Sequence, residues 1–144
     1  MRALLILALL GAGCAGPAPA AARHVNLPGR TDTRPFSNAV LAGDTLHLSG
    51  ALGIDPETGE PPPAVADEVR LVLDSMVTRL ALVGMSMDDL VSVTVFCPDL
   101  SLYEEFNSIY RTYFSDGFPA RAFIGSGPLL RGARFEVMGT AVRR

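Results

Sequence analysis

The last quarter of the chain places two charged residues inside apolar, strand-like runs. Arg121 opens the Gly-rich run 122–130, and Glu136 lies within the second run, 135–142. A charge embedded in apolar strands costs free energy unless another group pairs it. A guanidinium in such a place suits a planar anion, because it can donate two parallel hydrogen bonds to a carboxylate. The pattern therefore predicts a site for a small carboxylate at Arg121.

Both residues also have a purely structural interpretation. Arg121 would then form an ion pair where two subunits meet, and Glu136 would pair with Arg131 or Arg134 along a strand edge. The sequence leaves these alternatives open.

The composition bounds the classes of function. A chain of 144 residues, 49% of them hydrophobic, suits a single globular domain. The chain contains no lysine, which excludes a lysine Schiff base and a Walker-type phosphate loop. The net charge is −3 and no basic run is longer than Arg143-Arg144, so we expect no nucleic-acid partner.

The first 23 residues are predicted to be a targeting segment and tether, with the domain spanning residues 24–144. A positive start precedes the apolar run 3–12, which is shorter than the roughly 20 residues that a membrane-spanning helix needs. Small residues then lead to Cys14, an ending that resembles the lipobox of bacterial lipoproteins, with Cys14 as the lipidated residue. We therefore expect export to the periplasm or the bacterial envelope, with any membrane contact through that anchor alone. The alternatives are an ordinary signal peptide cut near residues 18–22, or a chain retained in the cytoplasm.

Other reactive side chains give weaker signals. Cys97 ends an apolar strand-like run, so we expect it to be a small buried hydrophobe; a catalytic thiol would need a neighbouring histidine, and none can be named. The two histidines, His24 and His47, are far apart, and no spacing of Cys, His, Asp or Glu is typical of a metal site. The sequence predicts no metal and no cofactor.

Periodicity predicts the order β-β-α-β-α-β-β. The expected strands are 38–42, 45–49, 91–97, 121–126 and 133–142, and the expected helices are 65–83 and 102–113. Gly84 is the stop signal of the first helix, whose polar face we expect to include Glu68 and Arg79. Two helices against one mixed sheet make a two-layer α+β sandwich. The helices cover one face of such a sheet, so we expect association through the other.

Several ordered motifs resemble the Rid/YjgF family of enamine/imine deaminases. They are Arg34–Val40, Leu48–Gly59, Val93–Phe96, Phe106–Tyr110, and Pro119-Ala120-Arg121 with Glu136 fifteen residues after the arginine. The resemblance covers residue 34 to the C-terminus. It implies a chorismate-mutase-like (YjgF-like) sandwich that forms a homotrimer around a central barrel, with sites in the clefts between subunits.

The resemblance also implies roles for individual residues. Arg121 would hold the substrate carboxylate and Glu136 would orient or deprotonate the attacking water, with no metal or cofactor. Asn107, Phe36, Ser49 and Gly50 would line the cleft. Four positions depart from the pattern of many deaminases, and all four replacements are apolar: Phe36, Ala51, Ala122 and Phe123.

Three functions follow as alternatives. The first is a hydrolase of the 2-iminobutanoate/2-iminopropanoate deaminase kind, which converts 2-imino or enamino acids to 2-keto acids and releases ammonia. The second is a non-catalytic trimer that binds a small metabolite in the same cleft. The third, a ribonuclease, is a role of some relatives, and the acidic charge balance argues against it.

Overall fold

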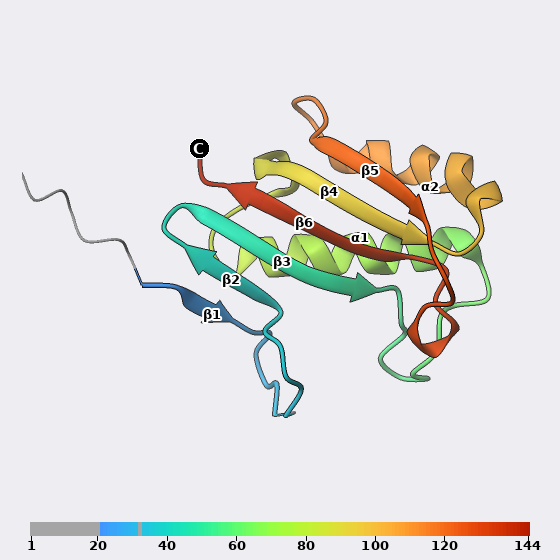
Figure 1. Ribbon diagram of the computed structural model, residues 1–144, viewed down its shortest axis with the longest axis horizontal. Helices are drawn as coiled ribbons and strands as arrows, with labels where there is room; N and C mark the ends of the chain where they lie inside the picture. Colours follow the sequence, from blue (N-terminus) through green and yellow to red (C-terminus); the bar gives the residue numbers. More distant parts are fainter. Residues whose placement is uncertain (1–20, 32) are drawn as a thin grey trace, which may run out of the picture.

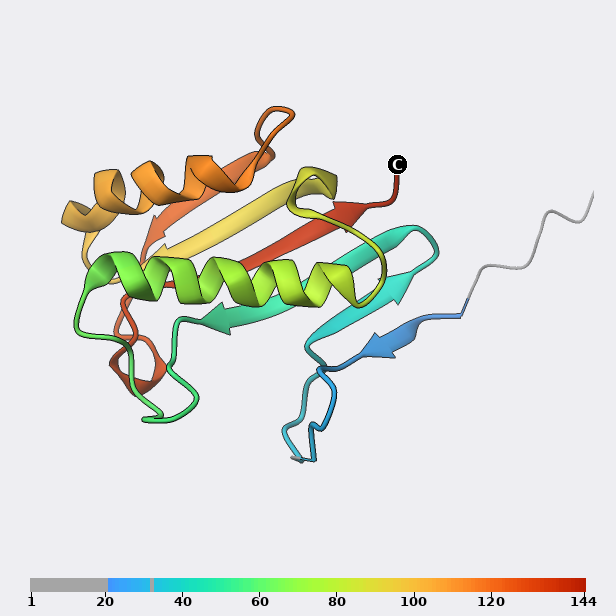
Figure 2. The same cartoon turned by 180° about the vertical axis from the view of Figure 1, so that it is seen from behind.

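The computed structural model describes residues 21–31 and 33–144, which form one six-stranded sheet with two helices on one face. The predicted segment around Cys14 lies outside the described residues. The strands are β1 Arg23–Val25, β2 Ala39–Ala42, β3 Thr45–Leu52, β4 Leu90–Cys97, β5 Ala120–Gly125 and β6 Glu136–Val142; the helices are α1 Val65–Ala81 and α2 Tyr103–Tyr110. Both helices lie in front of the sheet in Figure 2, and the opposite face is uncovered in Figure 1.

The sheet is mixed, with the strand order β1-β2-β3-β6-β4-β5. The pairs are antiparallel except for β4 and β5, which run parallel because α2 carries the chain back between them. The two-layer α+β prediction is therefore confirmed. The sequence did not predict β1. The Ala- and Pro-rich composition predicts a tether that ends at Arg23, whereas the residues from Arg23 to Val25 pair with β2.

Alternation along the strands builds the core. On β3, Leu46 and Leu48 are buried while His47 between them is exposed, as the sequence predicts. On β6, Val137 and Ala141 are fully buried against the helices. The sheet face beneath the helices is therefore the apolar one, and residues such as His47 belong to the uncovered face.

The helix α1 ends where its sequence predicts. Gly84 takes a positive φ of 70°, and the Met85 N–H donates to the Leu80 carbonyl at 3.0 Å. This left-handed position satisfies the end of the helix without the strain that a side chain would add. The Ser86 N–H then donates to Asp89 Oδ2 at 2.7 Å, which opens the short turn Met87–Asp89.

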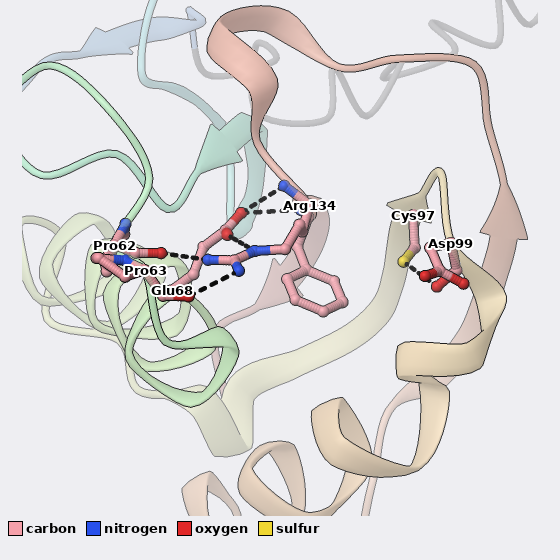
Figure 3. A network of polar contacts seen from close by, with 7 residues as sticks. Pro62, Pro63, Glu68, Cys97, Asp99 and Arg134 are labelled. Carbon is pink, nitrogen blue, oxygen red and sulfur yellow. Dashed lines mark hydrogen bonds and ion pairs between the residues drawn. The ribbon is translucent and has the colours of Figure 1, made fainter.

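The polar face expected for α1 is partly wrong, because Glu68 and Arg79 are buried. Glu68 is fully buried and accepts hydrogen bonds from the backbone N–H groups of Arg134 and Phe135 at 2.6 and 3.1 Å. The Arg134 side chain donates from Nε to Glu68 at 2.5 Å and reaches the carbonyls of Pro62 and Pro63 (Figure 3). Glu68 can therefore lie in the core, because its carboxylate is hydrogen-bonded and paired there.

Among the described residues, no helix is both long enough and apolar enough to cross a membrane.

The buried pair between Glu68 and Arg134 gives a stability prediction. We expect Glu68→Ala to lower the free energy of unfolding by about 3–5 kcal/mol, because it leaves a partly buried guanidinium and two backbone N–H groups without their acceptor. Asp67→Ala, at the position next to Glu68, is the matched control. It removes an exposed ion pair with Arg70, and we expect the free energy of unfolding to change by about 0–1 kcal/mol. Urea denaturation at fixed protein concentration measures both, and equal losses would show that the buried pair does not anchor the fold.

Candidate functional site

Arg121 lies on the edge strand β5 and points toward the helices. It is in register with Val93 of β4, which is 1% exposed and belongs to the helix-covered face. From there its Nη2 donates to Asn107 Oδ1 of α2 at 2.6 Å. Asn107, predicted to line the cleft, is thus the group that orients the guanidinium.

Four aromatic rings surround the Arg121 guanidinium. Its central carbon, Cζ, lies 4.6 Å from the centroid of Tyr110, and 5.8, 5.9 and 5.8 Å from those of Tyr103, Phe106 and Phe123. Ring faces attract a cation without neutralising it. Burial raises the pKa of Tyr110 to about 12 against the opposing effect of Arg121, so its phenol is neutral at physiological pH.

These neutral neighbours leave the positive charge of Arg121 uncancelled in the part of the chain that the structure describes. Among the described residues, no carboxylate lies within ion-pair distance of it. A cavity of about 310 Å³ lies beside the guanidinium, between α2 and the segment that leads into β5. Its volume falls at the lower end of the range of small-molecule sites, roughly 300–1,000 Å³. The arrangement suits a small anion.

Glu136 occupies the other face of the sheet. It begins β6, in register with Leu52 and Phe96, and its neighbour Val137 is fully buried on the helix side. Its carboxylate lies over Gly50 of β3: a Cβ built on Gly50 would approach Glu136 Oε1 to 2.0 Å. Gly50 therefore leaves the space that the carboxylate occupies.

The alternative pairing of Glu136 with Arg134 or Arg131 is wrong. Arg134 pairs with Glu68, and Arg131 donates to the Gly59 carbonyl at 3.2 Å. Within the part of the chain that the structure describes, the Glu136 side chain has neither a hydrogen bond nor an ion pair.

Ser49 and Phe36 lie toward the same end of β3 as Gly50. The Ser49 hydroxyl and N–H both bond to the Asn38 carbonyl, at 3.0 and 3.1 Å, which ties β3 to the segment that carries Phe36. Phe36 is 48% exposed, and Arg30 and Arg34 lie over its ring at 5.2 and 5.6 Å.

The predicted site residues thus fall into two groups within one chain. Arg121 and Asn107 lie between α2 and the sheet, whereas Glu136 lies over Gly50 on the uncovered face. The sheet separates the guanidinium from the carboxylate, so a site that uses both needs a second copy of the chain.

Sequence reasoning missed Arg79, which supports the backbone at Ser49, a residue expected to line the cleft. Arg79 of α1 is only 8% exposed and donates to the Ser49 carbonyl at 2.9 Å. Burial, and then the charges of Arg34 and Arg30, lower the pKa of Arg79. Its signal was its spacing, because it follows the core residue Met76 by three positions and so lies on the buried side of the helix.

Cys97 is fully buried, as predicted, and donates to the Asp99 carbonyl at 3.0 Å (Figure 3). Burial raises the pKa of its thiol, which disfavours a thiolate nucleophile. Among the described residues, no three His, Cys, Asp or Glu side chains gather closely enough to hold a metal ion.

Comparison with known proteins places these features in context. The profile of the family described as Endoribonuclease L-PSP matches residues 30–143. A bovine protein named 2-iminobutanoate/2-iminopropanoate deaminase is 36% identical over 110 residues, 76% of this chain and 80% of the relative. The crystal structure of the Escherichia coli YjgF gene product superimposes with a TM-score of 0.77 at 28% identity, covering 85% of this chain and 99% of that one. Escherichia coli TdcF, solved with bound serine, gives a TM-score of 0.72 at 28% identity, covering 85% and 94%.

The contact between Gly50 and Glu136 can be tested directly. We expect Gly50→Ala to push the Glu136 carboxylate aside, because the new methyl group would occupy its place, while the unfolding free energy changes by about 1 kcal/mol. Gly127→Ala is the control, since a Cβ there meets nothing within 4 Å. Crystal structures of both variants measure the displacement. An unmoved carboxylate in Gly50→Ala would show that Gly50 does not set its position.

Proposed function

Because this chain belongs to the Endoribonuclease L-PSP family, which is the YjgF/Rid family, we propose that it hydrolyses 2-imino acids to 2-keto acids and ammonia. The observation that carries the proposal is the Arg121 guanidinium, which is held by Asn107 and four rings, has no carboxylate partner among the described residues, and faces a cavity. Such a group suits the carboxylate that all 2-imino acids share. TdcF was solved with serine, another small molecule with a carboxylate.

The proposed reaction needs positioning and one acid–base group. Arg121 binds the carboxylate and so fixes C2 of the imine, which is electrophilic when its nitrogen is protonated. Glu136 from a second copy accepts a proton from water as the water oxygen bonds to C2. The resulting carbinolamine then collapses to the keto acid: Glu136 returns its proton to the nitrogen, the C–N bond breaks and ammonia leaves, and the hydroxyl proton passes back to the Glu136 carboxylate as the C=O bond forms.

Assembly is part of the same proposal. The uncovered sheet face carries exposed apolar side chains, including Ile124, Met138 and Val142, which are 37–41% exposed. Apolar patches of this kind favour association, and the resemblance to the family gives the form, a homotrimer with a central barrel. In that arrangement, the uncovered face of one copy supplies Glu136 to the cleft that holds Arg121 of another.

A non-catalytic binding protein would use the same cleft. The apolar replacements at Phe36, Ala122 and Phe123 fit that alternative, because the resemblance implies that many deaminases differ there; Ala51, the fourth replacement, is buried in the core. Hydrolysis separates the two functions, since a binding protein holds the keto acid without accelerating its formation.

Two substitutions separate binding from chemistry. Arg121→Lys keeps the charge but loses the planar guanidinium that can donate two parallel hydrogen bonds to a carboxylate. We therefore expect binding of 2-oxobutanoate to weaken by about 1.5–3 kcal/mol. Glu136→Gln keeps the shape but removes the base, so turnover of 2-iminobutanoate should fall by about 10²-fold while keto-acid binding survives. Calorimetry measures binding, and keto-acid formation from imine generated in the assay measures turnover.

The outcomes discriminate between the functions. Unchanged turnover in Glu136→Gln would make Glu136 structural. A wild-type protein that binds the keto acid without accelerating hydrolysis would support the binding function instead.

Complementation tests whether the site spans two copies. Arg121→Ala and Glu136→Gln chains are each expected to be inactive alone. When they are unfolded and refolded together, about one site in four should combine an intact Arg121 with an intact Glu136, so about a quarter of wild-type activity should return. Light scattering should give about three chain masses for the protein without residues 1–23. Activity that never returns in verified mixed assemblies would place both residues in the site of one chain, or outside it.

A further inference from the structure

Two exposed aromatic rings flank the cavity beside Arg121. Phe118 is 66% exposed and Tyr103 is 40% exposed, and both line the cavity that the guanidinium faces. Phe118 precedes β5 and Tyr103 begins α2, so the rings come from the two elements that bound the cavity. Exposed large apolar side chains beside a charged group are typical of a ligand site rather than of a plain protein surface.

The two rings are held by further rings behind them. Tyr103 packs edge-on against Phe123 with centroids 5.0 Å apart, and Phe118 packs edge-on against Phe114 at 5.6 Å. Phe114 in turn contacts Tyr110 at 4.8 Å. The aromatic walls are therefore continuous with the rings around Arg121, and little reorganisation is needed to receive a ligand.

The cavity wall also carries polar groups, and some of them are hydrogen-bonded within the chain. Asn107 Oδ1 accepts from Arg121, and Arg111 Nε donates to the Asn107 carbonyl at 3.1 Å. The Tyr110 hydroxyl is buried and has no hydrogen-bond partner among the described residues. Arg121 and Arg111 thus supply the charged groups of the cavity, while the rings of Tyr103 and Phe118 supply exposed apolar surface.

We propose that the preferred substrate of this chain is a 2-imino acid with a planar aromatic side chain, which packs between Tyr103 and Phe118 while its carboxylate binds Arg121. The inference rests on the proposed function, because it takes the Arg121 cavity as the substrate site. Ring-to-ring packing distinguishes an aromatic side chain from a small aliphatic one, and an apolar pocket separates side chains that differ by a few carbon atoms by about 10-fold or more.

A second copy could also cover Phe118. We favour the ligand because the cavity holds a guanidinium without a carboxylate partner among the described residues, and a carboxylate with an aromatic side chain complements both features.

The test compares two substrates in the full chain. An L-amino acid oxidase generates the imino acid in the assay from phenylalanine or from 2-aminobutanoate, and keto-acid formation is followed with and without the protein. We expect kcat/KM to be about 10-fold or more higher for the aromatic imine. Phe118→Ala should lower the aromatic value about 10-fold and leave the aliphatic value within about 2-fold. Val77→Ala, which truncates an exposed apolar residue on α1, should change neither.

Binding of phenylpyruvate and 2-oxobutanoate, measured by calorimetry, separates the two proposals. Hydrolysis of both imines at equal rates, or equal losses in Phe118→Ala, would overturn the aromatic preference and leave the hydrolase function intact. No hydrolysis, together with tighter binding of phenylpyruvate that Phe118→Ala removes, would overturn the hydrolase and keep the ligand class. A Phe118→Ala variant that changes the mass in light scattering but not the substrate preference would make Phe118 an assembly contact and overturn the inference.

Discussion

The buried carboxylate of Glu68 connects three parts of the chain on which the candidate site depends. It accepts hydrogen bonds from the backbone of Arg134 and Phe135 just before β6, and the paired Arg134 reaches the carbonyls of Pro62 and Pro63 ahead of α1. It also lies against Gly53 just after β3: a Cβ there would come within 2.5 Å of Glu68 Cγ. Taking a carboxylate out of water is costly, and these partners together offset that cost. A fully satisfied buried group of this kind has few alternative arrangements, so it fixes the local geometry.

That geometry determines where Glu136 lies. Glu136 follows Arg134 by two residues, and Gly50 precedes Gly53 by three, so Glu68 fixes both sides of the contact between the carboxylate and β3. Because side chains alternate along a strand, a shift of one residue in β6 would turn Glu136 toward the helices and Val137 toward solvent. The buried pair excludes that shift.

The sequence predicted the order of the elements and the fold class, since the apolar spacing of each element is regular. It failed where polar residues occupy core positions. Glu68 and Arg79 were assigned to the polar face of α1 because of their charge, yet each stands at helical spacing from core residues, Glu68 four before Val72 and Arg79 three after Met76. Their burial depends on partners distant in sequence, the Arg134 and Phe135 amides and the Ser49 carbonyl, which periodicity cannot reveal. The strand β1 was missed for a similar reason, because three residues acquire their structure only from pairing with β2.

The distribution of charge in the last quarter of the chain explains why the site looks incomplete in one copy. Arg134 is neutralised by Glu68, and Arg131 donates to a backbone carbonyl. Arg121 contacts neutral partners, a side-chain amide and four rings, and Glu136 on the far face of the sheet has no cation beside it among the described residues. Two groups of opposite charge are therefore left uncompensated on opposite sides of one sheet, where neither can reach the other. Such charges persist in a fold when a ligand or a second copy compensates them, and a substrate with a carboxylate at one end and a protonated imine beside it offers a complement to both.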